Sequence, residues 1–146
     1  MQTLLFYCQH VLGMGHLMRS KALVEGLVDD FAVTFLNGGE LIPGFTFPAQ
    51  VDVINLPPLT SDAAFTGIQA GAGQRLEESM AARASLLIET YTRLQPDVLV
   101  IELFPFGRKK FAFELLPLLA LIRRDGSATK VVCSLRDIMV SRRDQW

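Results

Sequence analysis

The segment HVLGMGHLMRS, residues 10–20, places two glycines where a buried apolar run gives way to a helical pattern. Gly13 and Gly15 allow a tight turn and a close backbone approach to a ligand, and the N–H groups of residues 13–15, Met14 included, suit a negative or polar group. A P-loop would need Gly-Lys-Ser/Thr, and a dinucleotide fingerprint would need a third glycine where Met18 stands and an acid near the end of the second strand. Both of these familiar phosphate sites are therefore excluded.

His16 follows the glycine turn, and Arg19 lies three residues on, close to the same face of the predicted helix. A helix N-terminus disfavours positive charge, so it favours the neutral imidazole that a general base needs. Arg19 opposes the dipole there and needs an anion, from a carboxylate or from a ligand. The alternative is that His16 hydrogen-bonds a nearby carbonyl while Arg19 pairs with a surface acid. His10 lacks the helix-start position and ranks below His16.

Glu102 ends the run VLVIE, and a loop-like segment, FPFGR, follows it. This carboxylate could orient the His16 imidazole, pair with Arg19 or contact a sugar hydroxyl; the alternative is an acid that caps the next helix. Phe106 offers an aromatic face and Arg108 a partner for phosphate or carboxylate, although we expect Phe104 or Phe106 to pack in the core. Arg136 could contact an acceptor or form a local pair with its acidic neighbour.

Five apolar runs predict strands buried on both faces, as parallel strands covered by helices are. They are Thr3–Cys8, Phe31–Leu36, Val51–Asn55, Val98–Ile101 and Lys130–Cys133, and the helices between them are His16–Val28, Gln74–Leu94 and Lys109–Arg123. In the second helix Leu76 and Leu87 belong to the apolar face and Arg83 to the charged one. This alternation predicts an α/β fold: a doubly wound, Rossmann-like parallel sheet with strand order 3-2-1-4-5.

That strand order makes the first and fourth strands neighbours, which brings Glu102 beside the loop that carries His16. The turn Asn37–Glu40 is expected first as a turn and second as a polar wall of the same crevice. The connection 56–73 is long and rich in Pro, Gly, Ser and Thr, which is typical of a lid or of a disordered segment.

Composition limits the partners of the chain. Of its 146 residues, 50% are apolar and 20% charged, and 14 basic against 15 acidic residues give a net charge of −1, which argues against nucleic acid as a partner. Cys8 and Cys133 lie in apolar runs, which predicts buried thiols in a reduced, cytoplasmic compartment. We find no Asp-x-Asp motif or His/Cys cluster in the sequence and so predict no metal site.

The segments GMGHLMRS, VLVIELFPFGRKKFAFELLPLL and CSLRDI resemble the amino-terminal domain of GT-B glycosyltransferases, especially a group of bacterial predicted glycosyltransferases. More distantly they are similar to the transferase that adds N-acetylglucosamine to the lipid-linked peptidoglycan precursor. The resemblance covers residues 1–146 as one Rossmann-like domain and implies a two-domain enzyme with its active site in the cleft. This half would hold a sugar or lipid-linked acceptor, and a carboxyl-terminal half beyond Trp146 would bind the nucleotide-sugar donor.

The resemblance implies metal-independent sugar transfer to an acceptor hydroxyl, with His16 as the base, no cofactor, and no catalysis by this half alone. It also implies peripheral membrane contact by residues 109–124, a pattern that is equally typical of a helix packed on its sheet. Two alternatives stay open: a nucleotide-sugar hydrolase or epimerase of the same fold, and a non-catalytic, Rossmann-like module that binds an anion.

Overall fold

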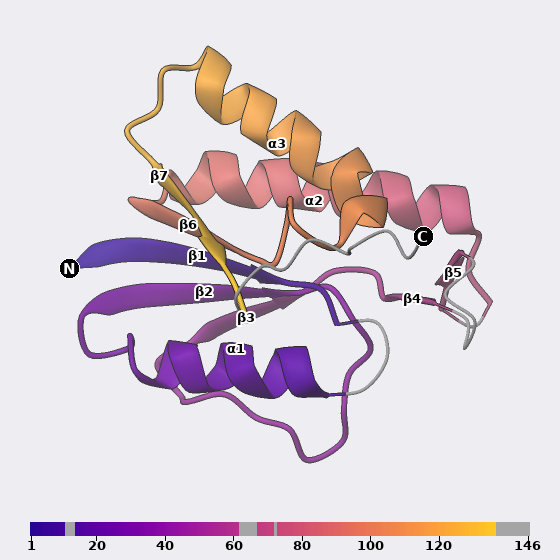
Figure 1. Cartoon of the computed structure of the whole chain (residues 1–146), viewed down its shortest axis with the longest axis horizontal. Coiled ribbons are helices and arrows are strands. Elements are labelled where there is room, and N and C mark those ends of the chain that lie inside the picture. The colour runs from indigo at the N-terminus through magenta and orange to yellow at the C-terminus, as the bar shows by residue number, and fades with distance from the viewer. Residues whose placement is uncertain (11–13, 62–66, 72, 137–146) are drawn as a thin grey trace, which may run out of the picture.

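A computed structural model of the chain describes residues 1–10, 14–61, 67–71 and 73–136 (Figure 1). Its main sheet is parallel and five-stranded, in the order β3-β2-β1-β6-β7. The strands are β1 (Gln2–Cys8), β2 (Phe31–Asn37), β3 (Asp52–Asn55), β6 (Val98–Glu102) and β7 (Lys130–Ser134). Because β4 and β5 form a separate small sheet, this order is the predicted 3-2-1-4-5, and the predicted fold class is confirmed.

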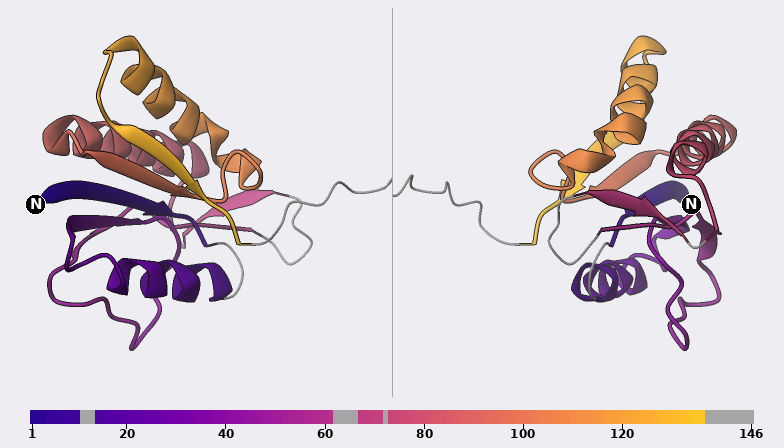
Figure 2. Two further views of the ribbon diagram at one scale, coloured as in Figure 1. Left: turned by 60° about the vertical axis from the view of Figure 1, so that its left-hand side comes forward. Right: turned by 90° about the vertical axis from the view of Figure 1, so that its right-hand side faces the viewer.

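Helices cover both faces of the sheet (Figure 2). The elements are α1 (Gly15–Glu25), α2 (Leu76–Leu94), a 3-10 turn η1 (Lys109–Phe111) and α3 (Ala112–Arg124). Alternate residues of β1 point into two cores: Leu5 and Tyr7 meet α2 and α3, whereas Phe6 and Cys8 meet α1. The central strand is therefore buried on both sides, which explains its uninterrupted apolar sequence.

Two residues of α2 lie on the opposite face of the helix from the one predicted. Ser79, Arg83, Leu87 and Tyr91 recur every fourth residue and are buried, so the inner stripe contains Arg83. The prediction placed Arg83 on the charged outer face, because a charge normally stays in water. Leu76, predicted on the apolar face, is 36% exposed in the first turn of the helix, beyond the edge of the core.

The outer strands β3 and β7 are not buried on both faces, contrary to the prediction. Val53 of β3 is 36% exposed, and Val131 and Val132 of β7 are each 45% exposed. Both strands lie at the ends of the sheet, where each pairs with a single neighbour. Their apolar composition matches that of the central strands, and sequence alone does not separate edge from centre.

Two further strands lie in the connection 56–73, where the sequence predicted a lid or a disordered segment. Strand β4 (Leu59–Ser61) pairs antiparallel with β5 (Ile68–Ala70). Leu59 is fully buried in the core under α2. The described part of the connection thus contains two paired strands that Leu59 anchors in the core; residues 62–66 and 72 lie outside the described part.

The crossover from β2 to β3 contains no described helix and packs on the α1 face through aromatic side chains. Phe47 lies on Phe35 of β2 with ring centroids 4.3 Å apart, and Phe45 meets Phe47 edge-on at 5.4 Å. Lys21 of α1 lies over the Phe45 ring, 5.2 Å from its centroid. These contacts replace the apolar stripe of a crossover helix and cover the outer half of the sheet.

Candidate functional site

The predicted neighbours β1 and β6 pair in the sheet and bring His16 and Glu102 together. Leu4–Tyr7 of β1 align with Val98–Ile101 of β6, so both strands end at the same edge. Glu102 is the last residue of β6, and His16 lies in the first turn of α1, which follows β1. Nδ1 of His16 is 2.7 Å from Oε1 of Glu102.

The Glu102 carboxylate is placed to orient the His16 imidazole. The Glu102 side chain has no exposed surface, whereas that of His16 is 20% exposed. A carboxylate only accepts hydrogen bonds, so Nδ1 of His16 is the donor, and in the neutral ring Nε2 then holds the lone pair. Oε2 of Glu102 is buried without a hydrogen-bond partner among the described residues. An unpaired buried carboxylate is costly, and the hydrogen bond from His16 offsets part of the cost of burying Glu102.

Cys8 lies directly behind His16. Its thiol contacts the His16 carbonyl oxygen at 3.9 Å, and the Ser20 hydroxyl donates to the sulfur at 3.3 Å. Burial raises the pKa of the Cys8 thiol to about 12, with the nearby Glu102 charge acting in the same direction. The thiol is therefore neutral at ordinary pH and serves as packing under the first turn of α1.

Within the described part of the chain, Arg19 forms no ion pair with an acid, the partner that the non-catalytic alternative proposed. Its guanidinium donates to the Ser134 hydroxyl at 2.8 Å and to the Leu135 carbonyl oxygen. Ser134 is the last residue of β7 and aligns with Glu102 in the sheet. Arg19 thus connects α1, the helix that carries His16, to the carboxyl end of the edge strand β7. The sequence analysis expected an anion as the partner of Arg19, whereas in the structure a hydroxyl and a carbonyl oxygen accept its hydrogen bonds.

The loop after Glu102 presents one aromatic ring to solvent and one to the core. Phe106 is 53% exposed, while Phe104 is buried in the core shared with α2 and α3. The backbone is left-handed at Leu103 (φ 66°) and Arg108 (φ 55°). A Cβ at Gly107 would lie 2.6 Å from the Leu103 side chain, so a larger residue at this position would force that side chain to shift.

Arg108 directs its positive charge toward the end of β1. Burial has the largest effect on the two pKa values there, raising that of Cys8 and lowering that of His10, and the Arg108 charge acts on both in the lowering direction. Nε of Arg108 is buried and has no hydrogen-bond partner among the described residues. A guanidinium N–H in this state is suited to an anionic group at the carboxyl edge of the sheet.

The remaining predicted site residues fall into three situations. Met14 precedes α1 as its N-cap and is 42% exposed. A Cβ added to Gly15 would meet no atom within 4 Å, so open space surrounds the helix start. Arg136 is exposed just beyond β7. Gly13 and Asp137 lie outside the described residues, so the tight turn at Gly13 and the pairing of Arg136 with Asp137 stay predictions.

His10 packs away from solvent, against the turn after β2. A Cβ on Gly39 would lie 2.3 Å from Nε2 of His10, which shows how closely the ring covers that glycine. Burial lowers the pKa of His10, and contacts with the Asn37 side chain and the Glu40 backbone partly oppose this effect. Residues 37–40 therefore act chiefly as a turn that supports His10.

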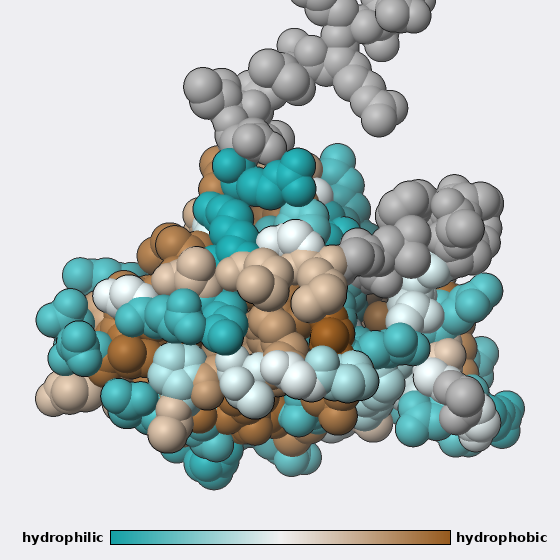
Figure 3. Space-filling view, turned by 90° about the horizontal axis from the view of Figure 1, so that it is seen from below, coloured by the Kyte–Doolittle hydropathy of each residue, from teal (hydrophilic) through white to brown (hydrophobic). Residues whose placement is uncertain are grey.

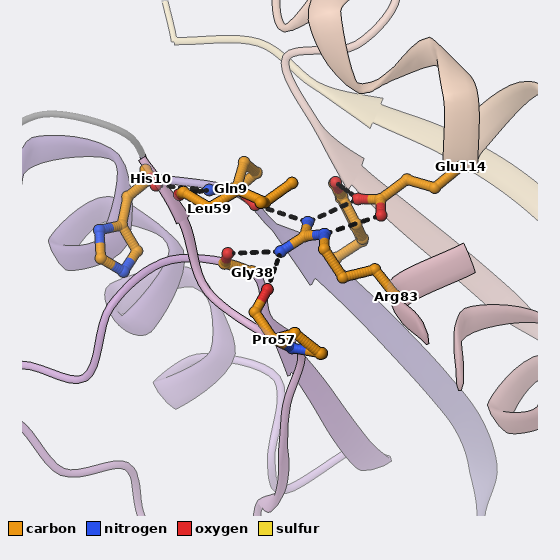
Figure 4. Close-up of polar contacts among 8 residues, drawn as sticks. Gln9, His10, Gly38, Pro57, Leu59, Arg83 and Glu114 are labelled. Carbon is orange, nitrogen blue, oxygen red and sulfur yellow. Dashed lines mark hydrogen bonds and ion pairs between the residues drawn. The ribbon is translucent and has the colours of Figure 1, made fainter. Parts of the chain in front are cut away.

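A buried ionic network, which the sequence analysis missed, holds three loops at the same edge (Figure 4). Arg83 donates to both Glu114 oxygens at 2.9 and 2.6 Å, to Gln9 Oε1 at 2.7 Å, and to the carbonyl oxygens of Gly38 and Pro57 at 2.7 and 2.9 Å. These contacts use every N–H group of the guanidinium. The side chains of Arg83 and Glu114 have no exposed surface.

Gln9 connects this network to the start of the glycine loop. Its Nε2 donates to the carbonyl oxygens of His10, at 2.6 Å, and of Leu59, at 3.2 Å. On the other side, the Tyr7 hydroxyl donates to Glu114, and burial followed by the Glu114 charge raises the pKa of Tyr7 well above its usual range. Two sequence signals could have indicated this pair: Arg83 falls in register with Leu87 and Tyr91 of α2, and Glu114 interrupts an otherwise apolar helix.

The residues that the structure describes include no group of three or more His, Cys, Asp or Glu side chains placed to hold a metal ion. They also contain no helix that is both long and apolar enough to cross a membrane.

Comparison with known proteins supports the fold. No family model and no curated protein sequence matches the chain. Among solved structures, UGT2 from Phytolacca americana, in complex with UDP-2-fluoro-glucose and pterostilbene, has 20% identity and a TM-score of 0.51 over 90% of this chain and 30% of that one. The apo form of UGT2 has 20% identity and a TM-score of 0.50 over 92% and 30%. The calicheamicin glycosyltransferase CalG4 has 19% identity and a TM-score of 0.48 over 90% and 32%.

At these identities the likeness concerns the fold alone. The chain has the fold of one part of a glycosyltransferase and spans about 30% of the length of UGT2. The predicted relation to glycosyltransferase structures is confirmed at that level.

Proposed function

We propose that this chain is the acceptor-side, amino-terminal part of a two-domain GT-B glycosyltransferase that transfers a sugar from a nucleotide donor to an acceptor hydroxyl. The observation that carries the proposal is the 2.7 Å contact between His16 and the fully buried Glu102 at the carboxyl edge of the sheet. Ligands of open α/β sheets bind outside this edge, where neighbouring strands diverge to opposite crossovers. The fold shared with UGT2 supports the same assignment.

In this reaction His16 is the general base. The acceptor O–H donates to Nε2 of His16, which takes the proton as the acceptor oxygen bonds to the anomeric carbon of the sugar. The bond from that carbon to the nucleotide diphosphate breaks, and its electron pair leaves on the phosphate oxygen. Glu102 accepts the Nδ1–H bond throughout and stabilises the imidazolium that forms.

Other residues in the crevice supply binding. Arg108 and the N–H groups at Met14 and Gly15 are suited to the negative charge of the departing phosphate, in place of a metal ion. Phe106 offers an exposed ring to the body of a sugar or lipid-linked acceptor. Arg19 holds α1 in position and does not bind the substrate, because its guanidinium already donates hydrogen bonds to Ser134 and Leu135.

The test uses protein made from the whole coding sequence, supplied with UDP- and GDP-sugars and a panel of hydroxyl acceptors. Release of nucleoside diphosphate should depend on acceptor and fall about 10²- to 10⁴-fold in His16→Ala, the range for a lost general base. Glu25→Ala, an exposed change near the other end of α1, should keep full turnover. Undiminished turnover in His16→Ala would contradict the proposal, and nucleotide release without any acceptor would reassign the site to hydrolysis.

A further inference from the structure

Strand β3 ends the main sheet on one side, and its outer edge is unpaired in the described part of the chain. It pairs with β2 alone. The Leu56 N–H, just beyond the strand, donates to the Asn37 carbonyl oxygen of β2. Backbone groups alternate between the two sides of a strand, so Ile54 also directs its groups to β2, whereas Val53 and Asn55 direct theirs away from the sheet. An edge of this kind is a template for another strand.

The spacing of these outward groups suits a second β3 strand that runs in the opposite direction. A two-fold axis at Ile54 sets Val53 of one copy opposite Asn55 of the other. Each such pair in an antiparallel ladder exchanges two N–H···O bonds, so the pairing uses every outward backbone group of Val53 and Asn55. One strand thus supplies both halves of the contact, as a two-fold interface requires.

A groove of about 500 Å³ opens beside the same strand, on the α2 face of the sheet. Its lining includes the apolar side chains of Ile54 and Leu86, which are only partly buried against the core. In the antiparallel pairing, Ile54 meets Ile54 of the second copy in a pair without hydrogen bonds, the kind in which side chains lie closest. The grooves of the two copies then adjoin across the axis, and their apolar walls leave the water.

Two charged side chains of α2 identify a second copy as the occupant of this groove. Glu89 and Arg93 line it, and neither forms an ion pair with another residue of the described ranges. The axis that pairs the strands also sets the two α2 helices antiparallel, so each copy brings one carboxylate and one guanidinium to the axis. Glu89 of each copy thereby gains Arg93 of the other as a partner. A partner with a single sign of charge would leave one of the two side chains unpaired.

The association is expected to be weak and reversible, because β3 is only four residues long. A non-obligate interface is about as apolar as the rest of a protein surface. Figure 3, which views the molecule from below and so from the α1 side, shows apolar side chains exposed between polar ones. We therefore expect a dissociation constant of roughly 10⁻⁵–10⁻³ M, that of a small, transient contact.

We propose that the chain forms a two-fold symmetric dimer in which β3 pairs antiparallel with β3 of a second copy and Glu89 of each α2 pairs with Arg93 of the other. The proposal goes beyond sugar transfer and does not depend on it. The His16–Glu102 pair lies between α1 and β6, on the other side of β1 from β3.

Sedimentation velocity and amide resonances of the isotope-labelled chain, followed from about 10 µM to 1 mM, test the proposal over the expected range of affinity. The chain should pass from monomer to dimer, and the backbone amides of Val53 and Asn55 should shift with it and become protected from exchange with water. A chain that is still monomeric at 1 mM would overturn the proposal. Shifts confined to β7, at the other end of the sheet, would overturn it as well.

A proline at position 53 tests the backbone pairing. Because the Val53 N–H points away from β2, Val53→Pro removes an outward donor and leaves the sheet intact, as proline does on edge strands. The dimer should dissociate about 10- to 100-fold more readily, since each copy loses one hydrogen bond. Val53→Thr keeps the N–H group and the β-branched shape and is the matched control. Equal association of the two variants would contradict pairing through β3.

An exchange of charges tests the choice of partner on exposed side chains that do not contribute to the core. Arg93→Glu places only carboxylates at the axis and should weaken the dimer about tenfold. The double variant Glu89→Arg/Arg93→Glu restores opposite charges between the copies and should recover most of the lost affinity. A double variant that associates no better than Arg93→Glu would rule out the ion pairs across the axis, and with them a second copy as the occupant.

Discussion

Replacement of Arg83 by methionine tests whether the buried network holds the carboxyl edge of the sheet together. Methionine has a similar length but donates no hydrogen bond, so Arg83→Met leaves the Glu114 carboxylate with only the Tyr7 hydroxyl. The Gln9 amide oxygen and the carbonyl oxygens of Gly38 and Pro57 also lose a donor. Because Arg83 and Glu114 are fully buried, water does not replace these bonds without local opening.

The expected loss follows from the unpaired charge. Removing one partner of a buried ion pair typically costs about 3–5 kcal/mol, so we expect the free energy of unfolding to fall by about 4 kcal/mol. That is a large part of the roughly 5–15 kcal/mol that stabilises a domain of this kind. The double variant Arg83→Met/Glu114→Gln buries no charge and keeps an acceptor for Tyr7, so it should recover about 2 kcal/mol relative to Arg83→Met.

Urea denaturation followed by circular dichroism at pH 7 measures these differences. The control is Arg75→Met just before the same helix, since the Arg75 side chain is 77% exposed and lies 3.5 Å from Glu78. An exposed pair of this kind contributes about 0.5 kcal/mol or less. The reasoning is refuted if Arg83→Met costs no more than Arg75→Met, or if the double variant is as unstable as the sum of its two single changes.

Three further results are expected. Gly15→Ala should fold at least as stably as the wild type, because its Cβ meets nothing within 4 Å and alanine favours a helix over glycine by about 0.5–1 kcal/mol. The same variant should weaken donor-dependent turnover if the reacting groups approach this backbone. Full activity would remove Gly15 from the site. Thiol-specific reagents at pH 8 should modify the partly exposed Cys133 well before Cys8, whose pKa burial raises to about 12; the reverse order, read by mass spectrometry, would contradict the packing described. Hydrogen bonds from the Thr3 backbone and hydroxyl lower the pKa of Asp97 in the folded state, so the stability they add is present above the unfolded pKa near 3.8 and is lost as the pH falls through the lower folded value. The destabilisation in Asp97→Asn should accordingly be measurable at pH 6 and shrink toward pH 2, and a difference that does not change with pH would contradict this linkage.

The order of the sheet was predictable because it depends on a pattern and a rule of handedness. Apolar runs that alternate with helices leave few topologies once crossovers are right-handed. The closeness of His16 and Glu102 followed from that order, because residues that end neighbouring parallel strands meet at one edge. These inferences needed the positions of the elements and no detail of side-chain packing.

Other features depend on packing that the sequence does not encode locally. The burial of Arg83 is stable only because Glu114, far along the chain, supplies the opposite charge, and single-residue preferences assign both to the surface. The exposure of Val53 and Val131 depends on which strands lie last in the sheet, which their composition does not reveal. The partners of Arg19 are a hydroxyl and a carbonyl that come close only in the folded chain.

The tie from Arg19 to Ser134 and Leu135 makes the proposed base sensitive to events beyond its own helix. His16 lies in the first turn of the same helix, so these contacts help to fix the position of the imidazole relative to the end of β7.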